Sequence, residues 1–145
     1  MQNIMEKVKV SFDFDCTLDR KCMQDYAALA ISKGVEAWIV TSRLDDKTYS
    51  LKYFTSLDIG ILANADLYEV ASNLGIPRDR VVFTNGEYKW HFFKANPGFA
   101  WHIDDDWMEN NYIIRYAKTP SINSWGNSSW STKCTRILRK HGVDI

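Results

Sequence analysis

The chain carries no excess charge of either sign. Its 145 residues include 18 Lys and Arg against 18 Asp and Glu, which gives a formal net charge of zero and a pI of about 6.8. A protein that binds nucleic acid or a membrane surface over a broad area usually carries a clear positive excess. The composition therefore excludes a broad electrostatic attraction to either partner and leaves room only for a local basic patch.

Long hydrophobic runs are also absent from the sequence. No apolar segment approaches the roughly 18 residues that a membrane span needs. Residues 1–7 have neither the apolar core nor the cleavage site of a signal peptide. We therefore expect a cytoplasmic protein with no membrane partner.

Cysteine is scarce and unpaired. Cys16, Cys22 and Cys134 make an odd number and contain no Cys-x-x-Cys pair, which favours a reduced protein. A phosphatase with a cysteine nucleophile would need an arginine six positions after that cysteine. The corresponding positions hold Cys22, Ala28 and Lys140. The sequence thus does not support that mechanism.

The length and composition fit one globular domain over residues 1–145. Hydrophobic residues make up 46% of the chain and charged residues 25%, both ordinary values for a globular protein with a proper core. Aromatic residues reach 14%, and we expect most of them to serve packing. We find no repeat, low-complexity tract or linker, and the sequence does not indicate an oligomeric state.

Apolar runs alternate with segments of helical periodicity along the chain. Strands are predicted over 7–13, 37–40, 81–84, 99–103 and 121–125. Helices are predicted over 23–31, 64–74, 87–95, 107–117 and 129–141. A continuous apolar run such as 37–40 is typical of a strand buried on both faces of a parallel sheet. The alternation predicts an α/β fold: a three-layer, Rossmann-like, doubly wound parallel sheet of about five strands.

Some local features are less regular. Residues 44–63 show no clear pattern, although a short helix through Tyr49, Leu51 and Phe54 fits part of the segment. Asn64 is a candidate N-cap for the helix that ends before Gly75. Ser128 or Ser129 is expected to cap the last helix.

Two carboxylates follow the first predicted strand. Asp13 and Asp15 stand where strand 7–13 ends, and sites in open α/β sheets form beyond the carboxyl ends of strands. Residues i and i+2 of an extended chain face the same way, so both carboxylates could serve one site. Two acids so close repel unless a cation or a shared proton relieves them. The alternative is a turn in which both side chains bond to local backbone.

Other polar residues follow the later strands. Thr41 ends strand 37–40, and Asp104 and Asp105 end strand 99–103, where such a density of negative charge favours a bound hard cation. Lys89 and Lys94 both follow the third strand. Lys89 is the better candidate for the site because it stands near the start of its helix, the end that adjoins the strand tip. Thr41 could instead only cap its strand, and either lysine could be a solvated surface residue.

The order of these groups resembles the haloacid dehalogenase (HAD) superfamily, most of whose members are magnesium-dependent phosphatases. The segment 13–17, Asp-Phe-Asp-Cys-Thr, is similar to its first motif, Asp-x-Asp-x-Thr, with Cys16 at the position of the usual glycine. An apolar strand ending in Thr41, a lysine, and an apolar strand ending in Asp104-Asp105 correspond to the other three motifs. Receiver domains use similar groups in a different order. The resemblance covers residues 7–110, and four ordered motifs are a specific signal.

The resemblance implies a mechanism and a set of site residues. Asp13 would attack phosphorus and form an aspartyl-phosphate, and Asp15 would act as acid and then as base. Thr41 and Lys89 would stabilise the transferring group. Mg²⁺ would be the cofactor. The expected phosphate-binding residues are Asp13, Phe14, Asp15, Thr41, Ser42 and Lys89. The expected metal ligands are Asp13, Asp15 through its backbone carbonyl, and Asp104 or Asp105. The further acids Asp106 and Glu109 are expected to lie on a solvated face.

The spacing of the motifs leaves no room for a cap domain, so the site should be open. An open site suits a phosphorylated substrate that is presented on something large or clamped by a partner subunit. The substrate could be a macromolecule or a nucleotide. Local specificity could come from residues near the motifs: Arg43, Tyr49 and Tyr53, or Asp19, Arg20 and Lys21. Two alternatives remain: a HAD-fold protein that binds a phosphorylated ligand without turnover, and a phosphatase of nucleic-acid ends. A basic strip beside Asp13 would favour the latter.

Overall fold

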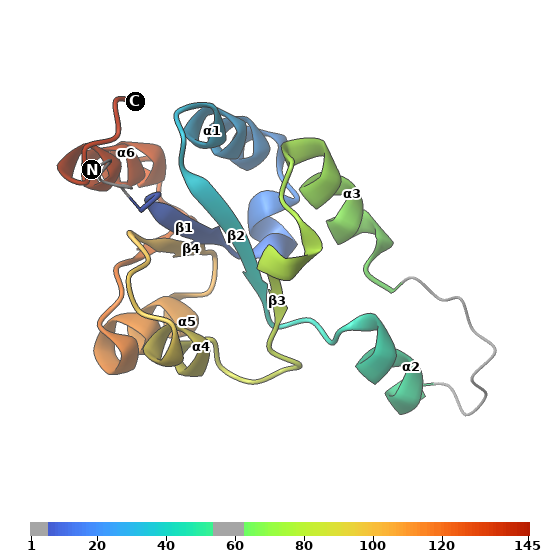
Figure 1. Cartoon of the computed structure of the whole chain (residues 1–145). Helices are drawn as coiled ribbons and strands as arrows, with labels where there is room; N and C mark the ends of the chain where they lie inside the picture. Colours follow the sequence, from blue (N-terminus) through green and yellow to red (C-terminus); the bar gives the residue numbers. More distant parts are fainter. Residues whose placement is uncertain (1–5, 54–62) are drawn as a thin grey trace, which may run out of the picture.

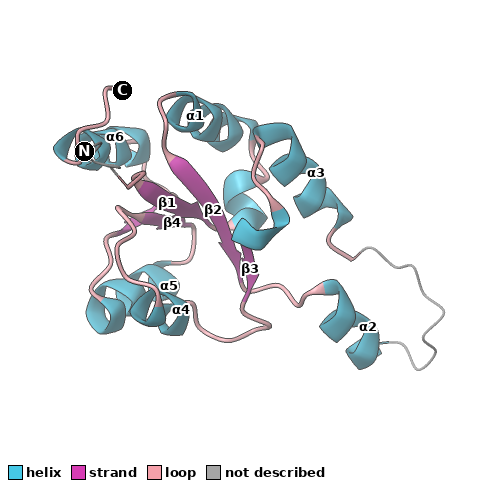
Figure 2. Ribbon diagram, viewed as in Figure 1, coloured by secondary structure: helices cyan, strands magenta, loops and turns pink. Residues whose placement is uncertain are grey.

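The computed structural model describes residues 6–53 and 63–145, and these form one parallel sheet with helices on both faces (Figures 1 and 2). The strands are β1 (Lys9–Phe12), β2 (Glu36–Thr41), β3 (Val81–Phe83), β4 (His102–Asp104) and β5 (Ser121–Asn123). Their order is β3-β2-β1-β4-β5, and every neighbouring pair is parallel. The predicted Rossmann-like three-layer fold is confirmed.

Two helical layers enclose the sheet. The first contains α1 (Lys21–Ser32), α3 (Ala65–Leu74) and α6 (Trp130–Lys140), and the second α4 (Trp90–Ala95) and α5 (Trp107–Tyr112). Successive residues of a strand point to opposite faces. Ala37 and Ile39 accordingly pack with the first layer, and Trp38 and Val40 with the second.

The same alternation fixes which side chains reach the site. Val10 and Phe12 of β1 are fully buried in the core beneath the first layer. Ser11 and Asp13 therefore point toward the second layer. The first-layer core is built around Trp101, which is fully buried and meets Phe12 edge to face at a centroid distance of 5.3 Å. Such a pair contributes about 0.5–1.5 kcal/mol beyond the area it buries.

Helix boundaries differ from the sequence prediction where a side chain is used elsewhere. Asn64 stands at the N-cap position of α3 but does not cap it. Its Oδ1 accepts from Arg43 at 3.4 Å, and its Nδ2 donates to Leu44 O and Asp46 Oδ1 at 3.0 and 2.8 Å, which orients the side chain away from the helix amides. Ser129 precedes α6, likewise without a side-chain cap bond. The predicted helix 107–117 is α5 followed by a wider turn, Ile113–Ala117, which ends at Lys118 in the left-handed region (φ 57°).

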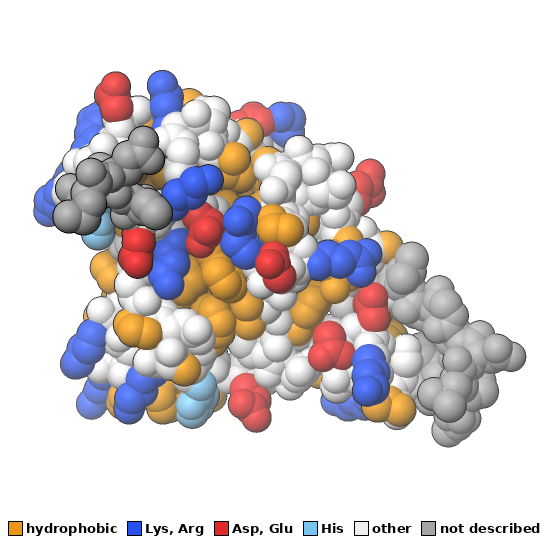
Figure 3. Space-filling model, viewed as in Figure 1, with side chains coloured by type: hydrophobic (Ala, Val, Ile, Leu, Met, Phe, Trp, Pro, Cys, Tyr) orange, Lys and Arg blue, Asp and Glu red, His pale blue; other side chains and the backbone are white. Residues whose placement is uncertain are grey.

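The short helix expected within 44–63 is present as α2 (Asp46–Tyr53), which holds Tyr49 and Leu51 and buries none of its residues. Phe54 lies outside the described residues. Among the helices of the described ranges, none has the length and apolar character to cross a membrane. On the face drawn in Figure 3, basic and acidic side chains are interspersed.

Candidate functional site

Asp13 and Asp104 meet at the carboxyl ends of the two central strands. β1 and β4 are neighbours in register Ser11↔His102, and the Asp13 amide donates to Ile103 O at 2.9 Å. Both carboxylates point toward the second helical layer and are buried. The adjacency of β1 and β4 brings together the acids that follow the first and the fourth strands.

Lys89 lies between these two acids. Its Nζ is 2.7 Å from Asp13 Oδ1 and 2.5 Å from Asp104 Oδ2, and the residue is only 2% exposed. It occupies the N-cap position of α4, the helix end that adjoins the strand tips. Lys94, in the last turn of that helix, is exposed and lies over the ring of Trp90. The structure thus places Lys89, and not Lys94, beside the acids.

Burial and charge act in opposite directions on this triad. Burial lowers the pKa of Lys89, but the charges of Asp13 and Asp104 outweigh it and raise that pKa, so the ammonium persists. Burial also opposes ionisation of Asp104, yet hydrogen bonds from His102 and the charge of Lys89 bring its pKa below the usual range. Burial raises the pKa of Asp13 well above its ordinary value, because Lys89 compensates only in part and Asp104 adds a further negative charge.

His102 is a buried partner of Asp104 that the sequence interpretation missed. Its Nε2 lies 2.9 Å from Asp104 Oδ2, and its Nδ1 lies 2.8 Å from the hydroxyl of Ser11. Because burial lowers the pKa of His102, the neutral ring donates through Nε2 and accepts from Ser11. The available signal was the strand period: residues 102 and 104 lie on one face, as do 11 and 13.

Glu109 corrects the expectation of a solvated acid. It is 6% exposed, and its carboxylate faces Lys89, with Oε1 3.3 Å from the backbone N of Lys89 and Oε2 4.0 Å from its Nζ. Burial raises the pKa of Glu109. Helical spacing explains the position, because Asp106 caps α5 by accepting from the amides of Met108 and Glu109, and Glu109 then sits one turn inside. Asp106 itself is exposed, as predicted.

Asp15 stands at the rim. After Asp13 the chain leaves the strand through the turn Phe14–Leu18, in which Cys16 adopts the left-handed region with φ 58°. Asp15 is exposed, and both of its oxygens accept from the guanidinium of Arg43, at 2.7 and 2.9 Å. Arg43 also makes two hydrogen bonds to Asp66, at 2.8 and 2.9 Å. The bidentate contacts therefore set the orientation of Asp15.

The remaining expected residues lie close by in different roles. Thr41 is buried, and its hydroxyl accepts from the amide of Arg43 at 3.2 Å, which is the strand-capping contact that the sequence left open. Phe14 is buried beneath Arg43, whose guanidinium lies 4.8 Å from the ring centroid. Thr17 donates to Asp13 Oδ2 at 3.3 Å. Ser42 borders an open depression of about 430 Å³ that Asp13, Asp15, Lys89, Asp104 and Asp105 also line.

Three carboxylates of this depression could hold a metal ion. Asp13, Asp104 and Asp105 each bring one oxygen into a group whose members all lie within 4.8 Å of one another. Around an ion bound at about 2.1 Å, as Mg²⁺ is, ligand oxygens lie about 3–4 Å apart, so a small movement would close the shell. Three carboxylates and the Lys89 ammonium leave a formal charge of −2, which a divalent ion would balance. The side chain of Asp15 is not in this group, and coordination by its backbone carbonyl remains a prediction.

The description of the site comes from the sequence and structure of this chain alone. No protein-family model matches it, and no curated protein matches it.

Proposed function

We propose that the protein is a Mg²⁺-dependent phosphomonoester hydrolase of the HAD type that acts through an aspartyl-phosphate on Asp13. The observation that carries this proposal is the convergence of Asp13, Asp104 and Asp105 on one side of an open depression, with the ammonium of Lys89 beside them. A phosphoryl group brings negative charge to carboxylates, so it needs both a cation and a fixed positive side chain there.

The raised pKa of Asp13 supports a cation site beside its carboxylate. Its pKa is raised by burial and by Asp104 despite the contact with Lys89, so the surrounding protein groups do not fully stabilise its ionised form. A nucleophilic carboxylate must be ionised. A divalent ion held by Asp13, Asp104 and Asp105 would lower that pKa and would offset the charge of the incoming phosphate.

The reaction would proceed in two steps. A carboxylate oxygen of Asp13 forms a bond to phosphorus as the bond to the leaving oxygen breaks, and protonated Asp15 gives its proton to that oxygen. Water then attacks phosphorus, Asp15 takes its proton, and the bond from phosphorus to Asp13 breaks to release inorganic phosphate. Lys89 stabilises the charge on the transferring group throughout.

Turnover of p-nitrophenyl phosphate with Mg²⁺ tests the proposal. Asp13→Asn keeps the shape and removes the nucleophile, so turnover should vanish while a cooperative urea transition shows that the variant still folds. Asp25→Asn, an exposed acid that pairs with Lys21 on α1, is the matched control and should keep full activity. Undiminished turnover in Asp13→Asn would sink the assignment. If the parent shows no turnover but phosphate with Mg²⁺ raises its melting temperature, the non-catalytic alternative is favoured.

A further inference from the structure

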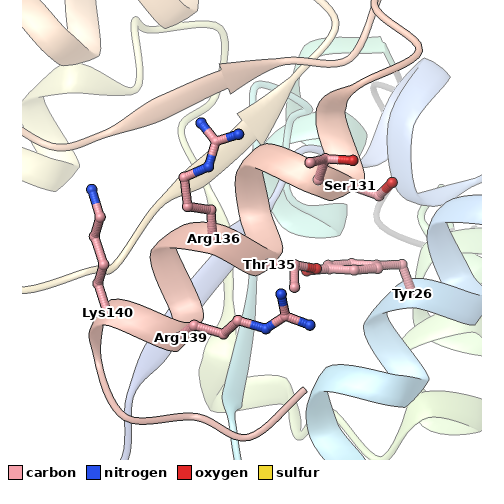
Figure 4. Close-up of a pocket in the computed structure, with 7 residues that line it drawn as sticks. Tyr26, Ser131, Thr135, Arg136, Arg139 and Lys140 are labelled. Carbon is pink, nitrogen blue, oxygen red and sulfur yellow. The ribbon is translucent and has the colours of Figure 1, made fainter.

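A second depression lies away from the catalytic residues, between α1 and α6. It measures about 830 Å³ and is lined by hydroxyl groups and by three cations. Figure 4 shows Arg136 and Lys140 on one flank and Tyr26 with Arg139 on the other, with Ser131 and Thr135 between them. We call this depression the α1/α6 groove.

The sequence of α6 explains why this groove is positive. Arg139 and Lys140 follow Arg136 by three and four residues and so lie with it on the outer face of the helix, while Cys134 and Leu138 are buried beneath it. The helix contains no Asp or Glu. Within residues 6–53 and 63–145, no acidic side chain forms an ion pair with any of the three cations. Arg139 Nε does donate to the backbone oxygen of Ile145 at 2.9 Å. The charges of Arg136 and Lys140 therefore remain the most available to an external anion.

The first residues of α1 and α6 follow the carboxyl ends of β1 and β5, the sheet edge at which Asp13 and Asp104 lie. α1 begins just after the turn that carries Asp15, and α6 begins after β5, whose last residue, Asn123, pairs with Asp104. Between these two helix starts, Arg20 lies over the ring of Trp125 at 5.6 Å. Trp125 is 61% exposed. A cation and an accessible aromatic ring thus lie together on the segments that precede the two helices.

We propose that the α1/α6 groove binds the phosphodiester backbone of a single-stranded nucleic acid whose phosphorylated end reaches Asp13. Guanidinium, ammonium and hydroxyl groups are the usual partners of backbone phosphates. The span from Ser131 to Lys140 is about 14 Å at 1.5 Å per residue, enough for more than one phosphate. Trp125 offers a stacking surface that only an unpaired base can use, which favours a single strand over a duplex. The inference names a substrate class and so rests on the proposed function.

Fluorescence anisotropy with a short, 3′-phosphorylated, labelled oligodeoxynucleotide tests the groove without turnover, using Asp13→Asn as the background. The logarithm of the affinity should fall linearly with that of salt concentration. Changing Arg136, Arg139 and Lys140 to Gln should reduce the slope by roughly 2, since each neutralised phosphate of a single strand contributes about 0.7. Trp125→Ala should weaken binding roughly 5- to 150-fold at fixed salt, the worth of one stacked base.

A matched control distinguishes an effect of the groove on binding from an effect of the protein's net charge. Changing Lys94, Arg115 and Lys118 to Gln removes three exposed cations from the other helical layer and should leave the slope unchanged. An equal loss in both triple variants would overturn the proposal, as would binding of the parent without salt dependence. Groove-dependent binding to vesicles that contain phosphatidylserine, without binding to the oligonucleotide, would also overturn it in favour of a lipid surface.

Activity distinguishes the two proposals. With Mg²⁺, the groove variant should lose kcat/KM toward the phosphorylated oligonucleotide and keep full turnover of p-nitrophenyl phosphate, which is too small to reach the groove. If p-nitrophenyl phosphate is turned over but the groove variant binds and cleaves the oligonucleotide like the parent, the groove proposal alone fails. If nothing is turned over yet oligonucleotide binding depends on the groove, the phosphatase assignment alone fails.

Discussion

Replacement of Lys89 by Met should destabilise the protein more than any other single change at the site. Met preserves the length of the side chain and removes the charge that holds Asp13 and Asp104, at 2.7 and 2.5 Å, in an environment where Lys89 is 2% exposed. Removing one partner of a buried ion pair costs about 3–5 kcal/mol because the other charge is left uncompensated. That is a large part of the roughly 5–15 kcal/mol that stabilises a domain.

Urea unfolding followed by tryptophan fluorescence measures the effect, since the chain contains six tryptophans. With a slope of about 2 kcal/mol per molar, the midpoint should fall by roughly 1.5–2.5 M. The deficit should shrink as the pH is lowered, because protonation of Asp13 and Asp104 removes the charges that Lys89 had neutralised. The double variant Asp13→Asn, Lys89→Met should likewise recover part of the stability that Lys89→Met loses. The interaction energy between the two substitutions should be about 0.5–3 kcal/mol.

Lys94→Met is the control, because Lys94 is an exposed residue of the same helix and should change stability by no more than about 0.5 kcal/mol. Equal midpoints for the two variants would refute the electrostatic account of the site. So would a deficit in Lys89→Met that is independent of pH and of Asp13→Asn, since loss of packing alone would produce that pattern.

Three further changes test the surroundings of the site. In the unfolded chain His102 takes up a proton near pH 6.5, whereas in the folded protein burial lowers the pKa of the ring and keeps it neutral. The free energy of unfolding should therefore fall below pH 6.5 by up to about 1.4 kcal/mol per pH unit. Urea titrations of His102→Gln should show a smaller fall. Millimolar Mg²⁺ should raise the melting temperature, and Asp105→Asn should abolish this rise while raising the metal-free value; a parent curve indifferent to Mg²⁺ would rule out the shared metal site. Cys16→Gly should raise the free energy of unfolding by up to about 1 kcal/mol because φ is 58° there. Cys22→Gly, in the first turn of α1, should instead lower it by about 0.3 kcal/mol. Equal losses would contradict a strained backbone at Cys16.

The sequence predicted the strands, their parallel arrangement and the residues at their carboxyl ends. Hydrophobic runs decide which segments are buried, and a right-handed alternation of strands and helices leaves few topologies. The choice of Lys89 over Lys94 also followed from position alone, because the N-terminal end of a helix adjoins the tip of the preceding strand. Sequence patterns therefore predict where a residue stands along the chain and which face of its helix or strand it occupies.

The partners of each side chain were harder to predict. Glu109 was expected in solvent because an acid in a helix usually faces water, and only the contact of α5 with Lys89 makes it buried. Arg43 was one candidate for specificity among several, and its simultaneous hold on Asp15 and Asp66 joins residues that stand 28 and 23 positions away. Asn64 has the right residue type for a cap, but a tertiary contact with Asp46 takes its amide.

The α1/α6 groove shows that the distribution of charge in space was also hard to predict from the sequence. A count of 18 against 18 argues against a nucleic-acid partner only if the charges are mixed evenly in space. In the folded chain, the acids Asp13, Asp104 and Asp105 gather where two strands end, and the cations of α6 gather on the outer face of another helix. Attraction of a phosphate chain depends on the local field within about one Debye length, roughly 8 Å at physiological salt, and not on the total. If both proposals hold, this neutral protein binds a polyanion along one helix while the acidic group at the ends of β1 and β4 receives its phosphorylated end.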